Sequence, residues 1–169
     1  MTNVSSREGV VPTAKAIANF FIEKARDDGI VVDQLKLQKL IFYAHAWHLA
    51  YELGPLFPDD IEAWPHGPVI RDVYVEFADN GRLPISRLAS DFDGTKPSTG
   101  NAPGRTQQLL NAVWSRYKGY TGIQLSNATH GEGEPWSQIQ RAYGSLERKP
   151  RIPNELIERT FRRKLESAS

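Results

Sequence analysis

The chain contains no cysteine. That absence excludes disulfides, cysteine-ligated zinc, iron–sulfur clusters and thiol catalysis. The chain also lacks an excess of charge, since 21 lysines and arginines are balanced by 20 aspartates and glutamates to a net charge of +1. Strong non-specific binding to nucleic acid requires uncompensated positive charge. The balance therefore argues against nucleic acid as a partner.

Long hydrophobic runs are absent too. The most apolar stretch, residues 40–53, is interrupted by His45, His48 and Glu52 and is too short to span a bilayer. Residues 1–10 are polar and carry no apolar segment of signal-peptide length. We therefore expect a cytoplasmic protein that does not associate with membranes.

What the chain does have is enough apolar material for one core. Hydrophobic residues make up 40% of its 169 residues, and a single domain of this length buries a substantial core. The spacing of apolar residues and the glycine and proline boundaries predict about seven helices and two or three short strands. The expected fold class is mainly α with a small β element, in a single compact domain.

The domain is expected at residues 13–165, after a flexible N-terminus at residues 1–12 and before a short tail at residues 166–169. Within it, residues 89–105 are rich in glycine and proline and show no apolar period, so they predict a mobile loop. The expected helices lie at about residues 13–28, 33–53, 68–80, 106–118, 121–130, from 135 (with Trp136, Ile139 and Tyr143 inward) and from 153.

Three short extended segments are expected between these helices. Residues 61–64 predict one strand, residues 83–86 an extended piece that could pair with it, and residues 151–152 a third strand. Residues 65–68 predict a turn, with Pro68 at the first position of the following helix.

The longest expected helix, residues 33–53, is predicted to lie at the centre of the fold. Its apolar residues form two stripes, which indicates burial on most sides. Lys36, Lys39 and Tyr43 define its expected solvent-exposed edge.

Catalytic and metal-binding patterns are weak. His45 and His48 are three residues apart on the central helix with Glu52 nearby, but the H-E-x-x-H arrangement is missing, and buried structural histidines explain them better. His66 and His130 lie beside glycines at element boundaries, where imidazoles bind free backbone carbonyls. No nucleophile elbow, Walker loop or G-x-G-x-x-G is present. We expect that the protein has no catalytic residue, binds no metal or cofactor, and is not an enzyme.

The last helix carries a basic run at Arg159, Arg162, Arg163 and Lys164. Two explanations stay open. Cations near a helix C-terminus are favoured by the helix dipole, and a basic cluster also attracts an acidic partner.

Several sequence blocks resemble the Panacea domain family, also called SocA-like or phage-associated proteins. The blocks follow the family's order and are IANFFI at 17–22, LKLQKLIFYA at 35–44, WHLA at 47–50, PLF at 55–57, I-x-AW-x-HGPV at 61–69, Tyr74, TH at 129–130, PW at 135–136 and IP at 152–153. Ala46 and its neighbour His45 depart from the family pattern, and residues 89–105 have no family counterpart.

The resemblance implies an antitoxin of a toxin–antitoxin system, of the kind found in prophages, that neutralises a protein toxin encoded nearby by direct binding. It implies as alternatives an adaptor that delivers the toxin to an AAA+ protease such as ClpXP, or a DNA-binding autoregulator. The resemblance implies no enzymatic activity, because none is established as common to the family. The motif residues that the resemblance marks as structural are Trp47, His48, Trp64, His66, Gly67, Pro68, His130 and Trp136.

For an antitoxin, we predict partner contacts at Lys36, Lys39, Tyr43, Arg71, Tyr74, Arg162 and Arg163. Lys39 is a charge between apolar stripes, and a salt bridge to Glu52 or Glu76 is the structural alternative. A helix-turn-helix around residues 28–29 would have a buried second helix and no recognition face. An enzyme built on His45, His48 or His66 is a third hypothesis.

Overall fold

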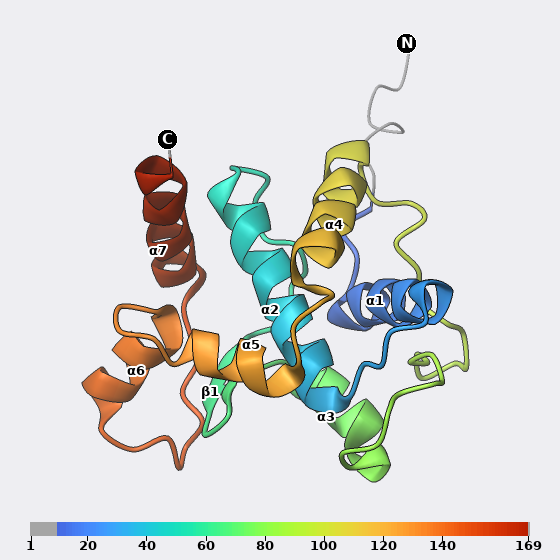
Figure 1. The fold of residues 1–169 in the computed structure, drawn as a ribbon, viewed down its shortest axis with the longest axis horizontal. Helices are drawn as coiled ribbons and strands as arrows, with labels where there is room; N and C mark the ends of the chain where they lie inside the picture. The colour runs from blue at the N-terminus through green and yellow to red at the C-terminus, as the bar shows by residue number, and fades with distance from the viewer. Residues whose placement is uncertain (1–9, 169) are drawn as a thin grey trace.

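Helix α2 (Gln34–Ala50) is the axis of the fold. The computed structural model describes residues 10–168, and Figure 1 shows α2 standing in the middle of them, with α7 on one side and α1 and α4 on the other. Every residue of α2 from Lys36 to Ala50 is buried. The two apolar stripes predicted this central position correctly, because a helix covered on all sides must present apolar groups all round.

The elements of residues 10–168 confirm the expected fold class of seven helices with a small β element. They are α1 (Ala14–Asp28), α2 (Gln34–Ala50), β1 (Glu62–Trp64), β2 (Gly67–Val69), α3 (Arg71–Phe77), the 3-10 helix η2 (Ala78–Asn80), α4 (Gly104–Tyr117), α5 (Gly122–Thr129), α6 (Pro135–Tyr143) and α7 (Asn154–Ser167). Strands β1 and β2 pair antiparallel, with Ala63 opposite Pro68. No helix in this part of the chain is long and apolar enough to cross a membrane.

Local sequence sets the helix ends. The side chain of Thr13 accepts a hydrogen bond from Ala16 N and Asp33 from Lys36 N, so both start helices as N-caps. Thr121 and Gln124 form a capping box at the start of α5. Gly29, in the left-handed conformation at φ 65°, closes α1.

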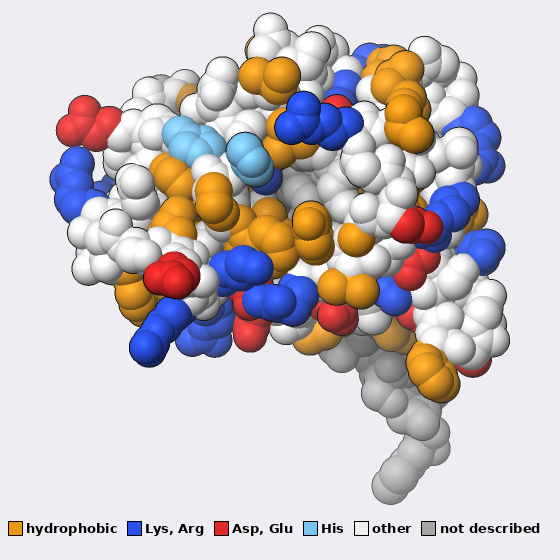
Figure 2. Space-filling model, turned by 90° about the horizontal axis from the view of Figure 1, so that it is seen from below, with side chains coloured by type: hydrophobic (Ala, Val, Ile, Leu, Met, Phe, Trp, Pro, Cys, Tyr) orange, Lys and Arg blue, Asp and Glu red, His pale blue; other side chains and the backbone are white. Residues whose placement is uncertain are grey.

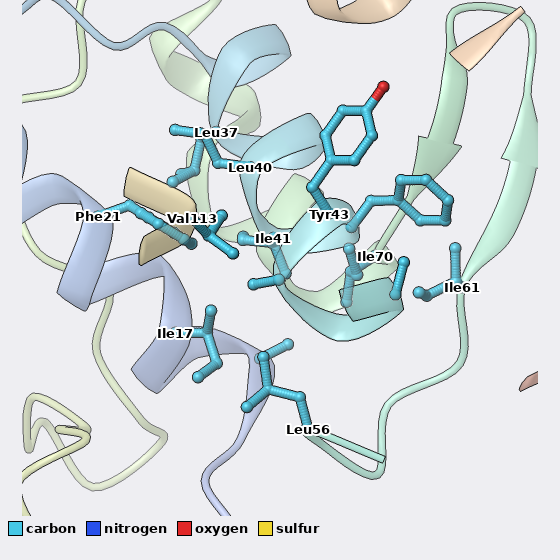
Figure 3. Packing of buried hydrophobic residues seen from close by; sticks show 14 of the residues in the cluster. Ile17, Phe21, Leu37, Leu40, Ile41, Tyr43, Leu56, Ile61, Ile70 and Val113 are labelled. Atoms are coloured by element: carbon cyan, nitrogen blue, oxygen red, sulfur yellow. The ribbon is translucent and has the colours of Figure 1, made fainter. Parts of the chain in front are cut away.

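The core lies where α1, α2 and α4 meet. Figure 3 shows Ile17 and Phe21 from α1 packed against Leu40 and Ile41 of α2, with Val113 of α4 alongside, and all five are buried. Ile61, just before β1, Ile70, just after β2, and Leu56 extend this cluster. Burial of such large apolar side chains is the main favourable contribution to folding.

Some expected elements are wrong. Pro68 lies in strand β2 and does not open a helix, so α3 begins at Arg71. Residues 83–86 form no strand, although Ile85 N donates one hydrogen bond to Val32 O. The third strand is reduced to a single bridge between Arg151 and Glu62. Tyr143 is exposed, because it lies in the last turn of the short helix α6.

The chain ends and the long loop can be placed only in part. Residues 1–9 of the expected N-terminal segment and Ser169 lie outside the described residues. Helix α7 continues through Ser167, two residues into the expected tail. Residues 89–103 form no helix or strand, and α4 begins at Gly104, two residues inside the expected loop at 89–105. Ala89, at the start of this loop, is hydrogen-bonded to the buried side chain of Asn19.

The N-cap of α2 provides a stability test. Asp33→Ala removes the acceptor of Lys36 N, so we expect the free energy of unfolding to fall by about 1 kcal/mol in urea titrations. Asp60→Ala is the control, because its carboxylate is exposed and makes one long ion pair of 3.7 Å to Arg151. Equal stability of both variants would contradict the role given to Asp33.

Candidate functional site

The turn of the β1–β2 hairpin is held by side chains from several other elements. Each of four main-chain carbonyls meets a different side chain: Trp64 O meets Trp136 Nε1 (2.7 Å), Pro65 O meets His130 Nε2 (3.1 Å), His66 O meets Ser126 Oγ (2.6 Å) and Pro68 O meets Lys39 Nζ (2.9 Å). Gln38 also accepts from Ile70 N and donates to Ile70 O. Motif blocks far apart in the sequence therefore meet at this hairpin.

Gly67 lets these side chains approach. Its φ is +117°, and a Cβ at this position would lie 2.7 Å from Thr129 Oγ1 and 2.8 Å from Lys39 Cε. The glycine of the H-G-P block is thus required both by its backbone conformation and by the space that Lys39 and Thr129 occupy.

Lys39 is completely buried, with 0% of its surface exposed. The structural alternative, an ion pair of Lys39 with Glu52 or Glu76, is wrong, because Glu52 pairs with Arg162 and Glu76 with Lys15 and Arg87. Burial lowers the pKa of the Lys39 amine to about 7. The Lys39 amine donates a hydrogen bond to Pro68 O, so Lys39 holds the hairpin against α2.

The solvent-exposed edge expected on α2 is wrong for all three of its residues. Lys36 and Tyr43 are buried like Lys39. Lys36 Nζ donates to Lys118 O at the C-terminus of α4, at 2.6 Å. The ring of Tyr43 stacks on that of Tyr117 at 4.4 Å, and burial raises the pKa of the Tyr43 hydroxyl.

His45 and His48 are bound by protein groups at both ring nitrogens. His45 Nδ1 accepts from Leu56 N (3.3 Å) and Nε2 lies 2.9 Å from Asn154 Oδ1. His48 contacts Gly54 O and Thr106 Oγ1 at 2.6 and 2.8 Å. Burial lowers the pKa of both imidazoles, that of His45 to about 4. Among residues 10–168, no three histidines or acidic residues are grouped as metal ligands.

The other two histidines lie at the hairpin. His130 contacts two carbonyls, Ser126 O at 2.6 Å and Pro65 O at 3.1 Å, as its position beside a helix end predicted. Its ring packs on Trp136 at 3.9 Å. His66 is exposed in the turn, and its main-chain carbonyl makes the contact to Ser126.

Two of the predicted contact residues, Arg71 and Tyr74, lie against the ring of Trp64 on the outer face of the hairpin. The Arg71 guanidinium lies 5.6 Å from the centre of the Trp64 ring, and the ring of Tyr74 packs against Trp64 at 4.7 Å. Lys149 lies over the same ring at 4.1 Å. Figure 2, which views the molecule from below, shows hydrophobic side chains gathered beside lysine, arginine and imidazole groups. Arg71 and Tyr74 thus share one aromatic surface, on which Arg71 is also ion-paired with Glu62 at 2.9 Å.

Arg162 and Arg163 lie apart from that surface, on α7. Arg162 forms ion pairs with Glu158 at 2.6 Å and Glu52 at 3.4 Å, and Arg163 is exposed. The basic run is therefore partly neutralised by acidic neighbours.

A hollow of about 590 Å³ opens between α2, α4, α5 and α7. We call it the aromatic groove, and it is lined by Tyr43, Trp47, Tyr51, Arg116, Tyr117, Tyr120, Gln124, Leu125, Ala128, Glu134, Lys164, Leu165 and Ala168. Trp47 Nε1 donates to Tyr117 Oη at 2.8 Å, which fixes two of its rings. Lys164 and Glu134 form an ion pair of 2.6 Å at its border.

Arg116 is the residue of the groove that sequence reasoning missed. Its guanidinium lies over the rings of Trp47 and Tyr117, at 5.2 and 5.3 Å. It takes part in none of the ion pairs formed among residues 10–168. The sequence feature that could have identified Arg116 is its position next to Tyr117, because a residue beside an inward-facing one lies near the edge of the buried side of the helix.

The structure is a helical domain in which residues of the motif blocks hydrogen-bond to the hairpin carbonyls. Its aromatic and basic side chains gather on the outer surface. Comparison with known proteins agrees with the motif blocks. The family described as antitoxin SocA-like, Panacea domain, matches residues 37–137, a range that contains the hairpin and the side chains bound to it. This chain belongs to that family, so the resemblance is confirmed.

One relative extends the match to most of the chain. Antitoxin SocA of Caulobacter vibrioides (strain NA1000 / CB15N) is 32% identical over 156 residues, which cover 88% of this chain and 82% of that protein. No solved structure matches the chain.

Gly67→Ala tests the close approach at the hairpin. The added Cβ would displace Lys39 and Thr129 and would hold alanine at a φ that it rarely adopts, so we expect a loss of about 3 kcal/mol or more in unfolding free energy. Gly119→Ala is the matched control, because nothing lies within 4 Å of its added Cβ. Similar urea midpoints for the two variants would disprove this requirement.

Lys39→Met tests the buried amine through pH. The pKa of Lys39 is lower in the folded state (about 7) than its ordinary value of 10.5, so the unfolded chain binds the extra proton between these values. The wild-type unfolding free energy, minus that of the variant, should therefore rise by about 2 to 3 kcal/mol from pH 6 to pH 9. A difference that stays constant or falls would show that the amine is not buried as described.

Proposed function

We propose that this chain is an antitoxin that neutralises a cognate protein toxin by binding it directly. Membership of the SocA-like family and the relative named Antitoxin SocA support an antitoxin role. Direct binding is supported by the aromatic groove, which opens to the surface and is lined by tyrosine and tryptophan rings in fixed positions. Its arginine, Arg116, has no acidic partner among the described residues.

The groove has the composition of a protein interface. Tryptophan, tyrosine and arginine are the residues that most often dominate binding energy in interfaces. The Tyr43–Tyr117 stack and the hydrogen bond from Trp47 hold the rings in place before binding, so little conformational entropy is lost when a partner docks. Arg116 would pair with a carboxylate of the toxin next to apolar side chains that enter the hollow.

The outer face of the hairpin is proposed as a second part of the interface. Arg71 and Tyr74 are exposed there, whereas Lys36 and Lys39 are buried and would contribute by holding the surface in shape. We propose that the encounter takes place in the cytoplasm, with the toxin encoded beside this gene.

Two other roles are less well supported. The buried helix α2 leaves no recognition helix for DNA in the first helix pair. Delivery of the toxin to an AAA+ protease stays a prediction from the resemblance. The two modes differ in toxin abundance, which falls only when the toxin is degraded.

Arg116→Glu tests the groove. Reversal of this charge should weaken toxin binding by at least about tenfold and reduce rescue of growth when the toxin is co-expressed. Arg105→Glu is the matched control, because it makes the same charge change on the exposed start of α4, away from the groove. Thermal unfolding should show both variants folded.

The proposal fails if the wild-type chain neither binds the neighbouring gene product in a pull-down nor rescues growth. If the wild type binds the toxin and Arg116→Glu and Tyr120→Ala, at the exposed border of the groove, bind it equally well, direct binding stands but the groove is not the contact surface.

A further inference from the structure

Phe92 is a fully exposed aromatic side chain, at 109% of its reference accessible area. It lies in the loop between η2 and α4, where the sequence reads Asp91-Phe92-Asp93-Gly94-Thr95. No other large hydrophobic residue between Val10 and Ala168 exceeds 69% exposure. A phenylalanine ring exposed this completely gains free energy when another molecule covers it, so Phe92 is a candidate contact residue.

The turn that carries Phe92 is closed by its own hydrogen bonds. Asp91 N donates to Thr95 O at 2.8 Å, and Gly94 N donates to Asp91 O at 2.9 Å. Asp93 Oδ1 accepts from Thr95 N and from Thr95 Oγ1, at 3.0 and 2.7 Å. Phe92 is therefore displayed on a defined turn.

The base of the loop is fixed to the core through one buried amide. Asn19, on α1, donates to Ala89 O (3.0 Å) and to Pro97 O (2.9 Å), and it accepts from Ala89 N (2.7 Å). These contacts hold both arms of the loop at once. Lys15 adds a fourth bond to Ser90 O at 3.0 Å.

Charge indicates what the displayed ring binds. Asp91 and Asp93 flank Phe92, and the hydrogen bonds from Thr95 lower the pKa of Asp93, so its carboxylate is ionised at neutral pH. Two carboxylates beside the ring oppose docking on nucleic acid or on an anionic membrane surface. They favour a protein pocket with an apolar interior and lysine or arginine at its border.

We infer that Phe92, with Asp91 and Asp93, is a contact point for the toxin, and that its ring enters an apolar pocket bordered by basic side chains. This inference rests on the proposed function. Because the turn and its base are ordered before binding, the ring docks without the entropic cost of folding a loop. The site lies on a different segment from the aromatic groove, so the two contacts can be tested separately.

The test uses the full chain and the purified product of the neighbouring toxin gene. Phe92→Ala should raise the Kd by about tenfold or more, while the melting temperature stays unchanged because the ring is outside the core. Phe92→Trp should retain binding. Leu83→Ala is the matched control, since Leu83 is an exposed loop residue at 68% and should not affect the Kd. Asp91→Asn should weaken the salt dependence of association.

Each outcome decides the inference. A Kd for Phe92→Ala equal to that of wild type overturns it, and if Arg116→Glu still weakens binding, the proposed function stands. No binding by the wild-type chain overturns both. If Phe92→Ala abolishes self-association of this chain but leaves toxin binding unchanged, the ring contacts a second copy, and the toxin assignment is wrong.

Discussion

The hydrogen bond from the buried Lys39 amine to Pro68 O is the contact on which the rest of the structure depends. A two-stranded hairpin of three-residue strands is not stable alone in water. Here α2 supplies Lys39 and Gln38 to it, and the segment from α5 to α6 supplies Ser126, His130 and Trp136. Because a buried polar group without a partner is costly, these bonds fix the hairpin in one position.

The buried side chains of α2 are all bonded to or packed against protein groups, so a partner protein can contact only the outer surface. Helix α2 is covered by α1, α4, α5, α7 and the hairpin, so its lysines, tyrosine and histidines contact protein groups and not solvent. The aromatic groove, the outer face of the hairpin and the Phe92 turn are what a partner can reach. All three combine aromatic rings with charged side chains, which suits a protein partner better than a small polar substrate.

The sequence predicted the helices well and the side-chain partners poorly. Apolar spacing and caps such as Thr13 and Asp33 are local, so the helix boundaries could be read to within a few residues. Lys39 looked exposed because its acceptor, Pro68 O, lies 29 residues away in the sequence. Pro68 looked like a helix start because proline is favoured at the first helical position, but in the structure it pairs with Ala63 in the hairpin. Arg71 and Tyr74 were predicted as large aromatic or basic residues on the helical scaffold, and their contact with a partner stays a prediction. The groove is built from four helices and has no continuous sequence signal.

The most direct test of the account is a titration of the purified chain into its purified toxin, with no protease and no DNA present, while toxin activity is measured. Direct neutralisation predicts that activity falls in step with complex formation and reaches its minimum when the toxin is saturated. Toxin that keeps its full activity in this two-protein mixture, and loses it only when an ATP-dependent protease is added, would contradict the account.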